Sequence, residues 1–168
     1  RFTPKEKYEY SNSGYNVLAA IVEKVSGYSF GNFMENKVFG INSLENTGLY
    51  HQSLIISKMA TGYIMANGKN SKACCIDSAN LFGASSIYSS VGDLLKWSSV
   101  ISEEGFFRKE TLQKLFSPYS KMPDVSQQYA YGWVIEKIEN HTAIWHNGLD
   151  NGFASAMYQF PNEKTVII

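Results

Sequence analysis

Apolar side chains recur every three to four residues near the beginning of the chain, between Ser13 and Val25. This spacing places them on one face of a helix. Ser26 and Gly27 follow as a candidate helix end, because glycine readily adopts the left-handed conformation of a C-terminal cap. The pattern predicts an amphipathic helix with a buried apolar face, formed by Val17, Leu18, Ile21, Val22 and Val25.

Three further helices are predicted from start and stop signals. Ser29 is a candidate N-cap for a short helix that ends near Gly40. Residues 90–105 begin with a serine followed three positions later by an acidic residue, which resembles a capping box. A last helix spans residues 109–116 and stops before Pro118, because the residue ahead of a proline avoids helical angles.

The end of the chain has the pattern of strands. Aromatic and β-branched residues dominate four stretches separated by short turns, at residues 131–138, 143–146, 153–160 and 165–168. Consecutive strands joined by short turns predict an antiparallel meander. Residues 41–86 show no sustained period and are interpreted as mostly loop with short helical or extended pieces.

These elements predict an α+β fold in one domain spanning residues 1–168. Residues 1–128 are expected to be mainly helix and loop, and residues 129–168 to form the antiparallel strands. The chain has no starting methionine and stops within an apolar β-branched run, so we expect a partial domain, a fragment of a longer protein.

Composition narrows the possible partners. The chain is 44% hydrophobic and 18% charged, with 15 basic and 15 acidic side chains, which is typical of a globular protein. A net charge of zero gives no electrostatic reason to expect nucleic acid or an anionic membrane as partner. The longest helical apolar run, residues 17–22, is too short to span a bilayer. The adjacent Cys74 and Cys75 have no nearby histidines and form no zinc-binding set. No metal or organic cofactor is expected.

Tyr10, Ser11 and Asn12 form the first candidate site, just before the first predicted helix. Residues two apart on an extended segment point the same way, so a phenol and a carboxamide could enter one cleft. The alternative is structural, with Tyr10 as a packed aromatic residue and Asn12 or Ser13 as a helix cap.

His146, Asn147 and Gly148 form the second candidate site, at the end of a predicted strand. Glycine in a strand lets a ligand or another backbone approach closely, and the histidine two residues earlier shares its face. Here too a structural alternative stays open, because Gly148 could serve a turn or bulge and His146 could be a hydrogen-bonded strand residue.

Both candidate sites, taken together with a serine-rich segment between them, resemble the penicillin-recognising serine hydrolases, the superfamily of class C β-lactamases and DD-peptidases. The resemblance covers nearly the whole chain in three landmarks. The first is the Tyr-x-Asn box with its following helix, at residues 10–27, and the second is a serine-rich loop and helix, at residues 83–97. The third is a box with His, Asn and Gly, within residues 131–148. It implies part of the β-lactamase/DD-peptidase α/β sandwich.

The family's nucleophile is a serine in a Ser-x-x-Lys motif that precedes the tyrosine box. No serine of this chain has a lysine three residues later. The resemblance therefore implies that the nucleophile lies outside this chain and that the chain alone is inactive.

The resemblance also implies a role for each site residue. Tyr10 is the general base, Asn12 orients the substrate amide and the absent lysine, and His146 occupies the third-box position beside Tyr10. The remaining site residues are expected to bind substrate, and they are Ser11, Asn147, Gly148 and Leu149. The backbone N–H of Leu149 is expected to form half of an oxyanion hole.

Two departures from the family pattern bear on the substrate. His146 stands where class C β-lactamases usually carry lysine, and Asn147 stands where threonine or serine is common. The resemblance thus favours a DD-peptidase, D-amino peptidase or esterase over a β-lactamase, acting on a β-lactam, D-amino acid peptide or ester outside the cytoplasm. The alternatives are a non-catalytic ligand-binding or sensor domain of the same fold, and an unrelated α+β protein in which Tyr10 and His146 lie far apart.

Overall fold

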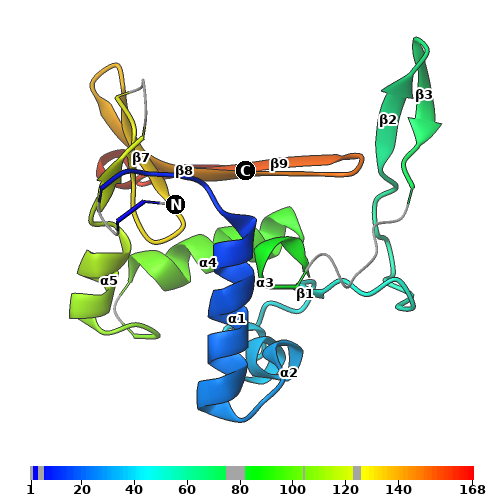
Figure 1. The fold of residues 1–168 in the computed structure, drawn as a ribbon, viewed down its shortest axis with the longest axis horizontal. Coiled ribbons are helices and arrows are strands. Elements are labelled where there is room, and N and C mark those ends of the chain that lie inside the picture. Colours follow the sequence, from blue (N-terminus) through cyan, green and yellow to red (C-terminus); the bar gives the residue numbers. More distant parts are fainter. Residues whose placement is uncertain (1, 4–5, 75–81, 104, 123–125) are drawn as a thin grey trace. The chain divides into compact units, whose positions relative to one another are not determined.

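The computed structural model describes residues 2–3, 6–74, 82–103, 105–122 and 126–168 (Figure 1). The chain forms two compact units. The first unit consists of Arg1–Tyr10, Leu94–Asn147 and Ala156–Ile168. The second unit consists of Ser11–Asp93 and Gly148–Ser155.

Helix α1 (Asn12–Ser26) of the second unit confirms the first predicted helix. Its N-cap is Ser11, whose Oγ accepts a hydrogen bond from the backbone N–H of Gly14 at 3.0 Å. Neither Asn12 nor Ser13, which the structural alternative made the helix cap, has this role. Gly27 closes the helix in the left-handed conformation, with φ of 75°, as predicted.

The face of α1 that is buried differs from the prediction. Ala19 is 3% exposed, whereas four of the five residues of the predicted stripe are exposed. The exposed fractions are 58%, 52%, 50% and 82% for Val17, Leu18, Ile21 and Val25, and the fifth residue, Val22, is half-buried. The expectation that all five form a buried face is wrong for the part of the chain that the structure describes.

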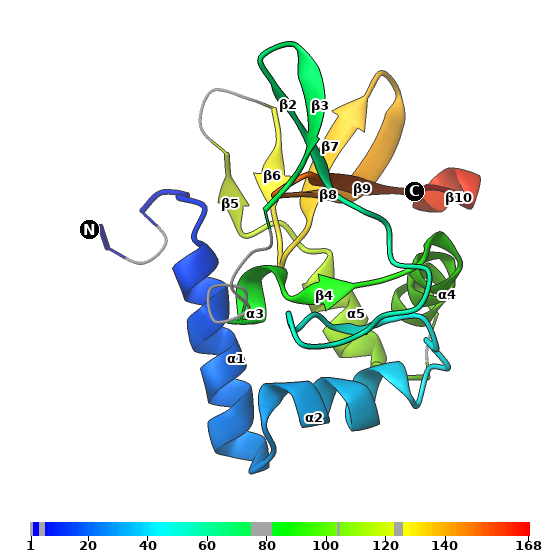
Figure 2. The same cartoon turned by 90° about the vertical axis from the view of Figure 1, so that its right-hand side faces the viewer.

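Small residues explain how α1 packs. Helix α3 (Phe82–Ser85) lies beside α1 in both views (Figures 1 and 2). A Cβ built on Gly83 would meet the Cβ of Ala19 at 2.5 Å and the backbone oxygen of Tyr15 at 2.6 Å. The two helices therefore approach through small side chains, which periodicity of large apolar residues does not reveal.

Helix α2 (Phe30–Met34) confirms the second predicted helix and continues as the π-helix η1 (Glu35–Phe39). Ser29 caps it as expected, since its Oγ accepts from the backbone N–H of Asn32 at 3.3 Å. Phe30 is buried, and its ring packs edge-on against Phe82 with centroids 5.6 Å apart.

The described residues of 41–86 are mostly loop with short helical and extended pieces, as predicted. Strand β1 (Gly48–Leu49) pairs with β4 (Ile87–Tyr88), and β2 (Tyr63–Ala66) pairs with β3 (Lys69–Lys72), all antiparallel. Asn67 and Gly68 join β2 to β3 with φ of 51° and 73°. An Asn-Gly pair with two positive φ angles is the signature of a tight hairpin, so the sequence carried a signal for this element.

Helix α4 (Val91–Ser102) begins as predicted and ends before Gly105. The backbone N–H of Asp93 donates to Ser90 Oγ at 3.1 Å, which is one half of the expected capping box. The Asp93 carboxylate, only 2% exposed, also accepts from the backbone N–H of Asn46 at 2.6 Å and from Thr47 Oγ1 at 3.0 Å. The capping residue thus also holds the loop before β1.

The largest sheet has six strands in the order β10-β9-β8-β7-β6-β5, with antiparallel pairing wherever the register is known. The predicted C-terminal meander is confirmed, and two short strands extend it. Helix α5 (Lys109–Leu115) precedes this sheet and matches the fourth predicted helix. The strands are β5 (Ser120–Lys121), β6 (Gln128–Tyr129), β7 (Val134–Ile138), β8 (His141–Asp150), β9 (Phe153–Phe160) and β10 (Thr165–Ile167).

The core of the first unit lies where α4 meets the sheet. Ile101 of α4 is 1% exposed, and Ala143 of β8 is completely buried. Val134 of β7 and Met157 of β9 are also buried. The predicted α+β fold, with helices first and an antiparallel sheet last, is confirmed.

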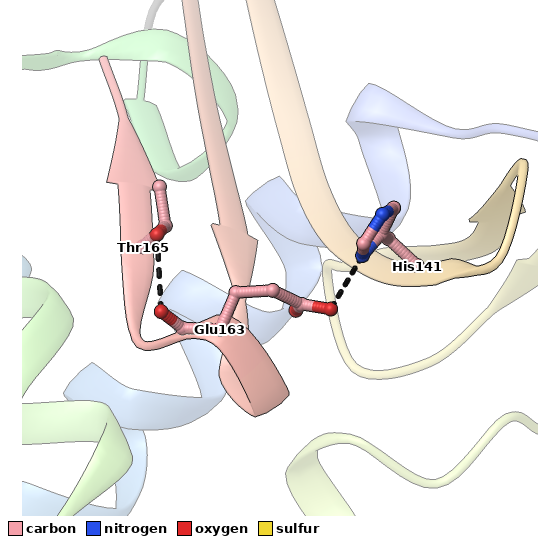
Figure 3. Close-up of polar contacts among 3 residues, drawn as sticks. All are labelled: His141, Glu163 and Thr165. Atoms are coloured by element: carbon pink, nitrogen blue, oxygen red, sulfur yellow. Dashed lines mark hydrogen bonds and ion pairs between the residues drawn. The ribbon is translucent and has the colours of Figure 1, made fainter.

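One surface ion pair joins two turns of the first unit. Nδ1 of His141, at the start of β8, lies 2.5 Å from Oε1 of Glu163 in the turn after β9 (Figure 3). The backbone oxygen of Glu163 also accepts from Thr165 Oγ1 at 3.1 Å. The hydrogen bond from His141 lowers the pKa of the Glu163 carboxyl below its ordinary value.

Glu163→Gln is therefore expected to lower the melting temperature at pH 6 and to lower it less at pH 3. A depressed folded-state pKa stabilises the protein above the unfolded pKa, and this contribution is lost as the pH falls through the folded value. Thermal unfolding at the two pH values measures the difference. Glu139→Gln, at an exposed carboxylate in the turn before β8, controls for the change of charge. An equal effect of Glu163→Gln at both pH values would contradict this account.

Gly83→Ala is expected to destabilise the protein by about 1–3 kcal/mol, because the added methyl group overlaps α1. Gly31→Ala is the matched control, since Gly31 also lies in a short helix but a Cβ there meets nothing within 4 Å. It should stabilise by roughly 0.5–1 kcal/mol. Urea unfolding of the two variants tests the prediction, and equal midpoints would show that α1 and α3 do not pack closely.

Candidate active site

Tyr10 and His146 lie side by side in the first unit. Tyr10 belongs to the irregular segment before α1, and His146 belongs to β8. The centroids of their rings are 6.2 Å apart, with 33° between the ring planes. The alternative in which these two residues lie far apart therefore does not hold.

His146 is hydrogen-bonded at both ring nitrogens. Nδ1 lies 2.7 Å from the backbone oxygen of Asn147, and Nε2 lies 3.1 Å from the hydroxyl oxygen of Tyr129 in β6. The side chain is half-buried, so its orientation is set by these two partners more than by water.

Tyr129 is a site residue that the sequence analysis missed. Its ring packs against Tyr8 with centroids 5.1 Å apart, and against His146 at 6.2 Å. We call Tyr8, Tyr10, Tyr129 and His146 the tyrosine–histidine cluster. The aromatic segment that begins at Tyr129 was noted from Tyr131 onward, but nothing in its spacing singled out which tyrosine meets the histidine.

Four of the predicted site residues belong to the second unit. Ser11 caps α1, Asn12 is the first residue of that helix, and both side chains are exposed. A Cβ on Gly148 would lie 2.7 Å from Ser155 Oγ of β9, so a neighbouring strand already explains the glycine. Leu149 is 85% exposed. Their predicted part in substrate binding stays a prediction.

Asn147, the remaining predicted residue, is exposed in β8. Its backbone oxygen holds Nδ1 of His146, which is a positioning contact that the sequence did not reveal. The predicted contact of its side-chain amide with substrate stays a prediction.

A shallow hollow in the second unit lies between β2 and the turn that joins β8 to β9. Leu149, Phe153 and Tyr63 give it apolar walls, and Asp150 adds a carboxylate. The turn and the hairpin are fastened together, because the backbone N–H of Tyr63 donates to Gly152 O at 3.2 Å. A Cβ on Gly152, where φ is 82°, would lie 2.6 Å from the Cβ of Ala73.

Among the described residues, no group of three or more His, Cys, Asp or Glu side chains is placed to hold a metal ion. In the same part of the chain, no helix is long and apolar enough to cross a membrane.

Two named proteins match nearly the whole length of this chain in sequence. Penicillin-binding protein 4* of Bacillus subtilis is 24% identical over 180 residues, which cover 99% of this chain and 40% of that protein. The mitochondrial serine beta-lactamase-like protein LACTB of Mus musculus is 26% identical, over 96% of this chain and 34% of that protein. This chain thus spans well under half the length of either relative.

Solved structures agree with the fold. A D-stereospecific amidohydrolase from Streptomyces superposes with a TM-score of 0.87 at 19% identity, over 98% of this chain and 50% of that one. The family model described as Beta-lactamase matches residues 1–168, the entire chain. The chain therefore belongs to the beta-lactamase family of penicillin-recognising serine hydrolases.

Proposed function

We propose that this chain is part of a serine acyl hydrolase that works through a serine acyl-enzyme, with the nucleophile outside the chain. The observation that carries the proposal is the approach of the Tyr10 and His146 rings to 6.2 Å, from segments at opposite ends of the sequence. Family membership supplies the reaction class, and the tyrosine–histidine cluster supplies groups that can move a proton.

Tyr10 acts as the general base in this proposal. It takes the proton of the attacking serine and returns it to the leaving group. A free phenol ionises only near pH 10, so this role needs a cation close by. The lysine of the absent Ser-x-x-Lys motif and a protonated His146 would supply the positive charge.

The exposed polar groups near Tyr10 and His146 in the sequence would bind the substrate. Asn12 orients the substrate amide and the lysine, and Ser11 stands between Asn12 and the base. The amide of Asn147 binds a carboxylate or acyl group, while Gly148 leaves room for it. The backbone N–H of Leu149 provides half of an oxyanion hole, and the nucleophilic serine provides the other half.

The substrate class follows from the third box. His146 and Asn147 replace the residues usual in class C β-lactamases. We therefore favour a D-amino acid peptide, amide or ester over a β-lactam, in keeping with the name of the Streptomyces amidohydrolase.

The location is proposed from the family alone. The Bacillus relative is named as a penicillin-binding protein, a class that acts outside the cytoplasm, and the mouse relative is named as mitochondrial. We propose an extracytoplasmic location on the strength of the first relative.

A second candidate function is a ligand-binding or sensor domain of the same fold. Both functions are compatible with the 168 residues, in which no serine has a lysine three residues later. The two functions separate on whether the full-length protein contains a Ser-x-x-Lys motif, because only the enzyme requires one.

Acylation by a labelled penicillin, followed by mass spectrometry, tests the proposal. The chain alone should form no adduct, and a longer protein that contains the upstream motif should form one. Tyr10→Phe in the longer protein should slow acyl transfer by roughly 100- to 10,000-fold, the usual contribution of a general base.

Tyr131→Phe is the matched control, since it removes the same hydroxyl from an exposed tyrosine outside the tyrosine–histidine cluster. An adduct on the chain alone would mean that the nucleophile lies within residues 1–168. Equal acylation rates for the longer protein and its Tyr10→Phe variant would remove Tyr10 from the mechanism.

A further inference from the structure

The two hydrogen bonds of His146 fix which of its nitrogens carries the proton. A backbone carbonyl can only accept a hydrogen bond, so Nδ1, 2.7 Å from Asn147 O, must be the donor. Neutral imidazole carries a single N–H. Nε2 of neutral His146 is therefore an acceptor, and the hydroxyl of Tyr129, 3.1 Å away, must donate to it.

The same two bonds determine which part of the ring is turned toward Tyr10. Both nitrogens are already occupied, by Asn147 and by Tyr129. Tyr10 approaches the ring itself, at a centroid distance of 6.2 Å and a tilt of 33°. A proton on Tyr10 has no direct hydrogen bond to His146 in this arrangement, and the nearest proton on Nε2 is that of Tyr129.

Neighbouring residues hold the backbone and the ring of Tyr129 in place. It lies in β6, opposite Val134 of β7. The tight turn between these strands is closed by the backbone N–H of Ala130, which donates to Trp133 O at 2.8 Å. The Tyr129 ring is half-buried and packs on Tyr8, so its hydroxyl can occupy few positions.

We propose that Tyr129 is a positioning residue, whose hydroxyl donates to Nε2 of neutral His146 and holds the ring against Tyr10, while Asn147 O keeps the proton on Nδ1. The value of this contact for catalysis rests on the proposed function, but the tautomer itself does not. When His146 gains a proton, Nε2 becomes a donor and the bond to Tyr129 reverses direction. Tyr129 thereby keeps contact with His146 in both charge states.

Nitrogen-15 NMR of the imidazole rings tests the proposal directly, because the two tautomers have opposite patterns of ring-nitrogen shifts. The experiment uses the longest soluble form of the protein that contains this chain, with assignment of His146 by His146→Gln. We expect neutral His146 to be the Nδ1–H tautomer. Tyr129→Phe should keep this tautomer, because Asn147 O still requires the proton on Nδ1, but it should shift the Nε2 resonance toward that of a nitrogen without a hydrogen-bond donor.

Tyr131→Phe is the matched control, because its hydroxyl bonds to Tyr119 and raises the pKa of that phenol rather than contacting His146. It should leave the Nε2 shift of His146 unchanged. An Nε2–H tautomer in the wild type would overturn the proposal. So would an unchanged Nε2 shift in Tyr129→Phe, since the Tyr129 hydroxyl would then not be bonded to that nitrogen.

A measurement on the wild type covers the case in which Tyr129→Phe fails to fold. The Tyr129 hydroxyl proton should show a scalar coupling to Nε2 of neutral His146, and a coupling-free hydroxyl signal in a folded sample would overturn the proposal. In an active protein, Tyr129→Phe should lower kcat by roughly 10- to 100-fold with little change in KM, as expected for misplacement of a reacting group. Absence of activity in the wild type with the expected tautomer would refute the proposed function and leave the inference on Tyr129 standing.

Discussion

The register between β6, β7 and β8 is the constraint on which the rest of the candidate site depends. Tyr129 is paired with Val134 of β7, and Val134 is paired with Trp145 of β8, so β7 fixes the position of β6 along β8. His146 follows Trp145 directly, and its Nε2 lies 3.1 Å from the hydroxyl oxygen of Tyr129. A slip of one position would turn His146 to the other face of the sheet and separate it from both tyrosines. Burial of Val134 and Ala143 in the core opposes such a slip, because apolar side chains would become exposed.

The predictable parts of the fold are those specified by local sequence signals, such as a capping glycine or a strand-like run of residues. Gly27 ended α1 where the cap rule places it, and the aromatic-rich run of residues 153–160 predicted the bounds of β9. The buried side of α1 was not predictable in this way. Periodicity identifies an apolar stripe, but the contact with Gly83 is made through Ala19, whose small side chain adds little to any hydrophobic pattern.

The candidate site was predictable only where the family motifs mark it. Tyr10 and His146 were singled out by their boxes, and their approach in space agrees with that choice. Tyr129 was missed because its importance depends on pairing across three strands, which no local spacing encodes. The Asn67-Gly68 hairpin was missed for a different reason, since its signal was present but lies within a stretch of mixed polarity.

The close packing at the base of the β2–β3 hairpin determines where this part of the protein tolerates substitution. Gly62 and Gly152 bring two backbones so close that no side chain fits between them, which makes the hairpin base and the β8–β9 turn one solid joint. Residues beyond the joint, such as Met65, which is 77% exposed, do not take part in this close packing. Substitutions at these exposed residues should therefore disturb the packing less than substitutions at Gly62 or Gly152, so the hairpin can change its surface while its base stays the same.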